Sequence, residues 1–268
     1  MTAQKGFVPH ITTIGTGDRP AVALHCTMAF GGAWKGLSAA LPQLSISAPD
    51  MPSHGRSPDW DEQSDFTRTV YEGALAAFPQ SGQVDVIGHS FGAATALHLA
   101  VTHPTRLRSL TVIEPVFFAV AREDHPEAIE AYDAVAQPFQ AALQAGDREA
   151  AAREFNRQWT SDAPDWEDLP ERSRAAMARA VHVVPGSRAY LYDDDAGLLA
   201  PDALPACTVP TLIIRGEHAH PAIIATNDGL AARMPNASQA VVAGAGHMAP
   251  ITHPVATAAA ILPLLERS

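Results

Sequence analysis

Short apolar runs alternate with longer mixed segments along most of the chain. The clearest runs occupy residues 21–25, 44–48, 84–88, 110–114, 211–215 and 239–243. Continuously apolar runs of this length, separated by helical segments, are typical of parallel strands that are buried on both faces of a sheet. The pattern therefore predicts a mostly parallel central sheet.

The segments between these runs carry the periodicity of helices that pack on a sheet. An apolar residue recurs every four positions at Phe66, Val70, Ala74 and Phe78. The last segment repeats in a similar way, with Val255, Ala258, Leu262 and Leu265 expected on one side. Both segments are predicted to be amphipathic helices.

The strand pattern disappears between about residues 119 and 205 and resumes after Pro210. Ala-rich, charged stretches at 126–136, 147–159 and 171–183 are predicted helices, because prolines and a glycine interrupt the pattern between them. We therefore expect an α/β fold with helices on both faces of the sheet. Its core should comprise residues 1–118 and 206–268, and residues 119–205 should form an inserted helical cap.

Composition narrows the range of partners. Hydrophobic residues make up 47% of the 268 residues, which is ample for one folded core. The formal net charge is -11 and no basic run occurs, so nucleic acid is an unfavourable partner and mainly neutral small molecules are the expected substrates.

No apolar stretch at the N-terminus has the character of a signal peptide, and no run of about 18 apolar residues occurs. We expect a cytoplasmic protein without a membrane partner, as a monomer or a homodimer. The two cysteines, Cys26 and Cys207, are expected to be reduced thiols.

A candidate nucleophile follows the third predicted strand. Residues 84–87 lead directly into Gly88-His89-Ser90-Phe91-Gly92, and an Ala-rich helical segment comes next. A G-x-S-x-G sequence between a strand and a helix places its serine on a sharp, exposed turn. The flanking glycines allow that turn, and the helix start favours a developing negative charge. Ser90 is therefore the predicted nucleophile.

A serine hydroxyl needs a neighbouring base, and a histidine after a late strand can supply it. Ala243-Gly244-Ala245-Gly246-His247 follows the last predicted strand, and its glycines allow a tight turn. His247 is the predicted base, whereas His89 and His103 are better explained by structural roles.

With these motifs in order, the chain resembles the α/β-hydrolase family over nearly its whole length outside the cap. Leu24-His25-Cys26-Thr27 stands where the family has a His-Gly pair, with Cys26 in place of the glycine. The resemblance implies that the backbone N–H groups of Thr27 and Phe91 form the oxyanion hole. Residues 50–57 resemble the family's D-x-P-G-H-G-x-S loop, with Ser53 in place of its first glycine.

The acid that orients His247 is less obvious. The family usually places an aspartate after the strand at 211–215, and that position falls on Ala219. Some members instead carry a glutamate at the end of the preceding strand. In this chain, Glu114 stands at that position, directly before Pro115. A buried carboxylate needs a partner, so Glu114 is the predicted acid. Glu217 is the alternative, and Glu114 could instead cap a loop or pair with an arginine.

These residues predict a serine hydrolase that resembles carboxylesterases, lactonases and thioesterases and forms an acyl-enzyme. A serine at this position disfavours the dehalogenases and epoxide hydrolases of the family, which attack with aspartate. Neither a metal nor an organic cofactor is expected. The expected pocket residues are Met28, Phe30, Phe117, Trp159 and Met248. Two alternatives stay open, a carbon–carbon bond hydrolase and a binding protein without catalysis.

Overall fold

A computed structural model of the chain describes residues 6–159 and 164–268. In this part of the chain, seven strands form one sheet in the order β1-β3-β2-β4-β5-β6-β7. All neighbours are parallel except β1, which pairs antiparallel with β3. The strands are β1 (Ile11–Ile14), β2 (Arg19–Leu24), β3 (Leu44–Pro49), β4 (Val84–His89), β5 (Leu107–Ile113), β6 (Thr211–Gly216) and β7 (Ala237–Val242).

The mostly parallel sheet predicted from the six apolar runs is confirmed, because each run coincides with one of the strands β2 to β7. The additional strand, β1, was not predicted from the sequence. It has only four residues at an edge of the sheet, its two isoleucines flank two threonines without alternating, and no residue in it is fully buried. Such a short edge strand carries little hydrophobic signal.

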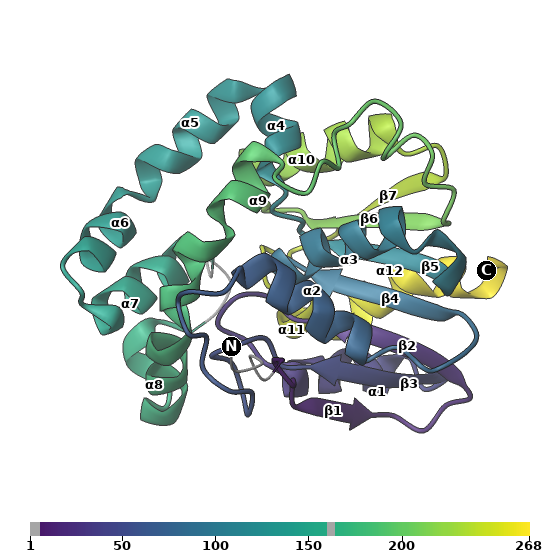
Figure 1. Cartoon of the computed structure of the whole chain (residues 1–268), viewed down its shortest axis with the longest axis horizontal. Helices are drawn as coiled ribbons and strands as arrows, with labels where there is room; N and C mark the ends of the chain where they lie inside the picture. The colour runs from purple at the N-terminus through teal and green to yellow at the C-terminus, as the bar shows by residue number, and fades with distance from the viewer. Residues whose placement is uncertain (1–5, 160–163) are drawn as a thin grey trace, which may run out of the picture.

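Helices cover both faces of the sheet, because successive side chains of a strand point to opposite faces. Val86 and Val112 pack in one cluster with α2 (Phe66–Ala76), α3 (Phe91–Thr102) and α10 (Pro221–Arg233). Ile87 and Ile113 point the other way, toward α1 (Lys35–Ala40) and α12 (Pro254–Arg267). Figure 1 shows the sheet between these two helical layers.

The predicted face of the last helix is correct for Ala258 and Leu265, which are buried, and wrong for Val255 and Leu262. In α12, Val255 is 72% exposed and Leu262 is 39% exposed. The buried positions are Thr257, Ala258, Ile261, Leu264 and Leu265. At about 100° of rotation per residue, these five residues lie on one side of the helix. Val255 and Leu262 lie next to each other just outside that side. The helix is therefore rotated relative to the predicted stripe.

Between β5 and β6 the described chain contains only helices and connecting segments. They are α4 (Phe118–Asp124), α5 (Pro126–Val135), α6 (Gln137–Gln144), α7 (Arg148–Trp159), α8 (Glu171–Ala180) and α9 (Arg188–Asp193), with 3-10 turns η3 (Trp166–Asp168) and η4 (Val181–Ser187). Figure 1 shows α5, α6, α7 and α8 gathered on one side of the sheet. Phe139, Ala151 and Trp166 belong to a separate hydrophobic cluster among these helices.

The three helices predicted in this region match α5, α7 and α8, whereas α4, α6 and α9 were missed. Pro138 is one of the prolines expected to interrupt the helical pattern, but it lies in the first turn of α6. Proline is tolerated there because the first N–H groups of a helix have no partner within it.

The remaining short elements are the 3-10 turns η1 (Gly31–Trp34) and η2 (Pro104–Arg106) and the helix α11 (Ala249–Thr252). Among the described helices, none is long and apolar enough to cross a membrane.

Candidate active site

Ser90 occupies the turn between β4 and α3. Its backbone has φ 57° and ψ -117°, a conformation that side-chain-bearing residues rarely adopt. A Cβ atom on Gly88 would clash with the carbonyl of Gly92, and one on Gly92 would clash with the carbonyl of Leu24. The N–H of Ser90 donates to the carbonyl of Ile113 at 2.9 Å, which ties the turn to β5. The two glycines and this bond hold the turn in place.

Glu114 directly follows β5 and is completely buried. Its backbone N–H donates to the carbonyl of Ile214 at 2.8 Å, which continues the ladder between β5 and β6. Its Oε1 accepts a hydrogen bond from the N–H of Gly216 at 2.6 Å. The carboxylate therefore has a fixed place at the carboxyl ends of two neighbouring strands.

The second carboxylate oxygen of Glu114 contacts His247. The distance between Oε2 of Glu114 and Nδ1 of His247 is 3.0 Å, and both side chains are buried. A carboxylate accepts hydrogen bonds, so this contact favours a proton on Nδ1 and an unprotonated Nε2. His247 is thus held in the tautomer that a general base requires.

Two further aromatic residues position His247. Nε2 of His89 donates to the backbone carbonyl of His247 at 2.8 Å, and burial lowers the pKa of His89 well below its usual value. The indole ring of Trp159 packs on the imidazole of His247, with the ring centroids 4.2 Å apart. His247 is consequently only 7% exposed.

Glu217, the alternative acid, has a different partner. Its side chain is exposed, and its Oε2 accepts a hydrogen bond from the N–H of Gly244 at 2.8 Å. Ala219 is a buried residue of the same loop. The contact with the imidazole of His247 is made by Glu114.

Thr27 and Phe91 line the same cavity as Ser90, and Phe91 directly follows Ser90 in the chain. Phe91 is the first residue of α3, so its N–H has no hydrogen-bond partner within the helix. Thr27 comes from the loop after β2, next to the buried Cys26. The structure therefore places both predicted oxyanion-hole residues in the lining of a cavity that Ser90 also lines.

Two neutral histidines brace the loop that carries Thr27. Nε2 of His54 accepts the N–H of Met28 at 2.9 Å, and Met28 has a φ of 65°. Nε2 of His25 accepts the N–H of Met51 at 3.1 Å, while its Nδ1 donates to the carbonyl of Cys26 at 2.8 Å. Burial lowers the pKa of both histidines, to about 3 for His54. Sequence reasoning missed this role, although both histidines stand in the quoted motifs.

In the loop at residues 50–57, Ser53 stands where the family has a glycine, and it adopts the positive φ that glycine favours. Ser53 has a φ of 64° and is completely buried. Its Oγ accepts the N–H of Trp60 at 3.0 Å and lies 2.8 Å from Nε2 of His182 in η4. Ser53 therefore connects this loop to the helical segment between β5 and β6.

Two cavities meet at Ser90. The first, which we call the α5 cavity, has a volume of about 820 Å³, and its walls include Phe118, Tyr132, Leu143 and Leu191. The second, the α8 cavity, has a volume of about 660 Å³, and its walls include Met28, Met177, His247 and Ile251. Both are also lined by Thr27, Ser90, Phe155 and Trp159.

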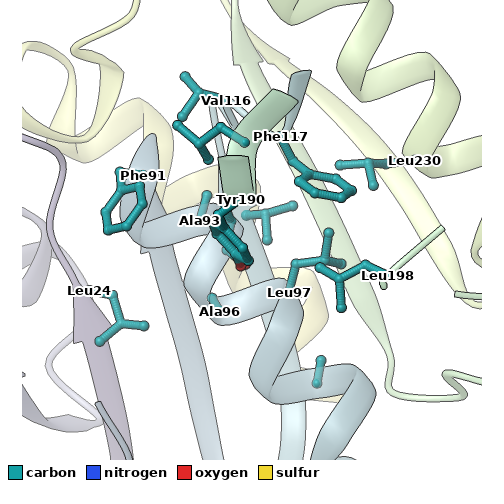
Figure 2. Packing of buried hydrophobic residues seen from close by; sticks show 14 of the residues in the cluster. Leu24, Phe91, Ala93, Ala96, Leu97, Val116, Phe117, Tyr190, Leu198 and Leu230 are labelled. Carbon is teal, nitrogen blue, oxygen red and sulfur yellow. The ribbon is translucent and has the colours of Figure 1, made fainter. Parts of the chain in front are cut away.

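Four of the five predicted pocket residues line the α8 cavity, namely Met28, Phe30, Trp159 and Met248. Phe117 lines neither cavity. Its side chain is completely buried, and Figure 2 shows it beside Leu230 in the hydrophobic cluster on the α3 face of the sheet. The ring therefore packs in the core and does not line the site. Phe155 of α7, which lines both cavities, was missed.

We also searched the described residues for metal-binding groups and reactive cysteines. No group of three or more histidine, cysteine, aspartate or glutamate side chains among these residues could hold a metal ion. Cys26 and Cys207 are both buried free thiols. Burial raises the pKa of the Cys26 thiol to about 12.

Sequence comparison identifies the family of the chain and relatives that match part of it. The profile of the alpha/beta hydrolase family matches residues 21–260. Lipase LipV of Mycobacterium tuberculosis is 36% identical over 110 residues, which are 40% of this chain and 41% of that protein. A pimeloyl-(acyl-carrier protein) methyl ester esterase of Neisseria meningitidis serogroup B is 36% identical over 90 residues, 32% of each chain. The chain thus spans less than half the length of these two relatives.

Comparison of structures agrees on the fold. A thermophilic esterase from Thermogutta terrifontis superimposes with a TM-score of 0.73 and 22% sequence identity. The match covers 99% of this chain and 96% of that one. At this level of identity the likeness extends to the fold alone.

Proposed function

The chain belongs to the alpha/beta hydrolase family, and from this premise we propose that it is a serine hydrolase acting on carboxylic esters. Lactones and thioesters share the same acyl chemistry and are included. In this proposal Ser90 is the nucleophile, His247 the general base and Glu114 the acid that orients His247. The helices between β5 and β6 serve as a cap over the site. The substrate is a small to medium, mainly neutral molecule.

The observation that carries the proposal is the 3.0 Å contact between Glu114 and His247. It joins residues 133 positions apart in the sequence, in a buried site that shares a cavity with a strained serine. An acid, a base and a nucleophile in this order are the requirements for activating a serine hydroxyl. A purely structural hydrogen bond between Glu114 and His247 would have no need of Ser90 in the same cavity lining as His247.

The reaction begins when Nε2 of His247 takes the proton of the Ser90 hydroxyl. Oγ then attacks the carbonyl carbon of the ester, and the carbonyl oxygen becomes an oxyanion. The N–H groups of Thr27 and Phe91 bind this oxyanion, aided by the N-terminal end of α3. When the tetrahedral intermediate collapses, the carbon–oxygen bond to the alcohol breaks. Protonated His247 donates its proton to the leaving alcohol, and the acyl group stays on Ser90.

Water completes the cycle by the same chemistry. His247 removes a proton from water, the hydroxide attacks the acyl-enzyme, and the proton returns to Oγ of Ser90 as the carboxylic acid leaves. Glu114 takes up no proton in this cycle. It holds the Nδ1–H of the imidazole and stabilises the positive charge that His247 carries in each step.

The relatives named above support an ester as the substrate, since one is called a lipase and the other a methyl ester esterase. A panel of aryl esters of increasing acyl length, run beside a vinylogous diketone, tests the proposal. We expect turnover of the esters, and none in the Ser90→Ala variant. Turnover of the diketone alone would instead identify a carbon–carbon bond hydrolase.

A further inference from the structure

We infer that the two cavities separate the two halves of the ester, with the acyl group in the α5 cavity and the leaving alcohol in the α8 cavity. This inference rests on the proposed function. It defines the substrate class as an ester whose acyl and alcohol parts are both sizeable and mainly apolar.

The position of His247 assigns the alcohol. The proton that releases the alcohol comes from the imidazole, so the leaving oxygen must lie next to His247. His247 lines the α8 cavity and not the α5 cavity. The alcohol therefore extends along Met28, Met177 and Ile251, which also line the α8 cavity.

The position of Phe91 assigns the acyl group. Phe91, whose N–H is a proposed oxyanion donor, lines the α5 cavity and not the α8 cavity. With the alcohol on the His247 side, the remaining substituent of the carbonyl carbon extends into the α5 cavity. Tyr132, Leu143 and Leu191 line it there.

The volumes indicate that neither half is small. Each cavity alone, at about 820 and about 660 Å³, lies within the range of complete small-molecule pockets. Phe155 and Trp159 of α7 line both cavities and so lie at their junction. An acetyl or methyl group would leave most of its cavity unfilled, whereas longer apolar groups would bury the walls.

Two exposed alanines on cap helices provide a matched test. Ala134 on α5 lines only the α5 cavity, and Ala176 on α8 lines only the α8 cavity. Tryptophan at either position narrows one cavity without disturbing a buried core. Ala131→Trp and Ala175→Trp, at exposed positions of the same helices that line neither cavity, are the controls.

Two series of esters are compared, one with a constant alcohol and acyl chains of increasing length, the other with a constant acyl group and alcohols of increasing size. We expect Ala134→Trp to lower kcat/KM for the longest acyl chains by about 10-fold or more, and to change little across the alcohol series. We expect Ala176→Trp to show the reverse. Gln140→Trp and Ser173→Trp repeat the comparison from neighbouring lining positions if either variant fails to fold.

Deacylation gives a second readout, because the alcohol has left before this step. Ala134→Trp should change the rate at which a long-chain acyl-enzyme decays, and Ala176→Trp should leave it unchanged. The acyl-enzyme on Ser90 is followed by intact mass. Reversed selectivities, or equal effects of both variants on both series, would overturn the assignment while an acylated Ser90 still supported the proposed function. Absence of any acyl-enzyme in the unmodified protein would overturn the proposed function itself.

Discussion

Glu114 and His247 are joined by a buried hydrogen bond of 3.0 Å between Oε2 and Nδ1. In the Glu114→Gln variant, the amide could turn a donor toward Nδ1, which would favour the wrong tautomer and leave Nε2 protonated. We expect kcat to fall by about 10⁴-fold, as when a triad aspartate becomes an amide. Ester turnover at saturating substrate measures this, and circular dichroism checks the fold.

Glu217→Gln is the matched control for that variant. Glu217 is exposed and accepts only the N–H of Gly244 among its described contacts, so the amide should keep most of the activity. If Glu217→Gln were the inactive variant and Glu114→Gln the active one, Glu217 would be the triad acid.

Ser90 and His247 should act as one unit. Ser90→Ala and His247→Ala should each lower kcat by several orders of magnitude, up to about 10⁶-fold, and the double variant should be no slower than the single ones. The reason is that the base has no function once the nucleophile is gone. Independent losses that multiplied in the double variant would show that the two residues catalyse separately.

The backbone conformation of Ser53 predicts that its glycine variant is more stable than its alanine variant. Ser53→Ala loses the contacts of Oγ with Trp60 and His182 but keeps a φ of 64°, which a Cβ disfavours. Ser53→Gly loses the same contacts but adopts that φ without strain. We expect the glycine variant to be more stable than the alanine variant by about 1 kcal/mol. Urea unfolding measures both, and the opposite order would contradict the strain at this position.

The buried histidines make the fold sensitive to acid. Burial, followed by the nearby His25, lowers the pKa of His54 to about 3 from a usual value of 6.5. Between about pH 6.5 and pH 3, His54 binds a proton in the unfolded chain but stays neutral in the folded chain. This contribution to stability is therefore complete above pH 6.5 and is lost as the pH falls toward 3, by on the order of a few kcal/mol.

His54→Gln isolates this contribution, because an amide oxygen can still accept the N–H of Met28 but does not titrate. The free energy of unfolding, measured between pH 7 and pH 4, should fall less steeply in this variant. The exposed His218→Gln variant is the control and should keep the original slope. Identical slopes in all three proteins would mean that His54 is not held neutral.

The parts of this fold that could be predicted are those with a local cause. Buried parallel strands are apolar throughout, so β2 to β7 are visible in the sequence, and the glycines around Ser90 mark a turn that only they allow. The contact of Glu114 with His247 could be predicted because a buried carboxylate that ends an apolar strand needs a partner.

The parts that could not be predicted depend on tertiary packing. Phe117 was expected in the pocket, but the direction of the chain after β5 places it in the core. Whether Val255 or Ile261 faces the sheet depends on how α12 is rotated, which an Ala-rich helix determines only weakly. The role of His54 arises from a loop that returns to Met28, 26 residues away in the chain.

Covalent labelling of the folded protein by a fluorophosphonate tests the central claim most directly. Such a probe forms a stable ester only with a serine whose hydroxyl is activated, and digestion followed by mass spectrometry identifies the modified residue. We expect a single label on Ser90, its loss in Ser90→Ala, and strongly slowed labelling in His247→Ala and Glu114→Gln. An unlabelled Ser90 in the folded, unmodified protein would contradict the account and would point to a binding protein that keeps the hydrolase fold without catalysis.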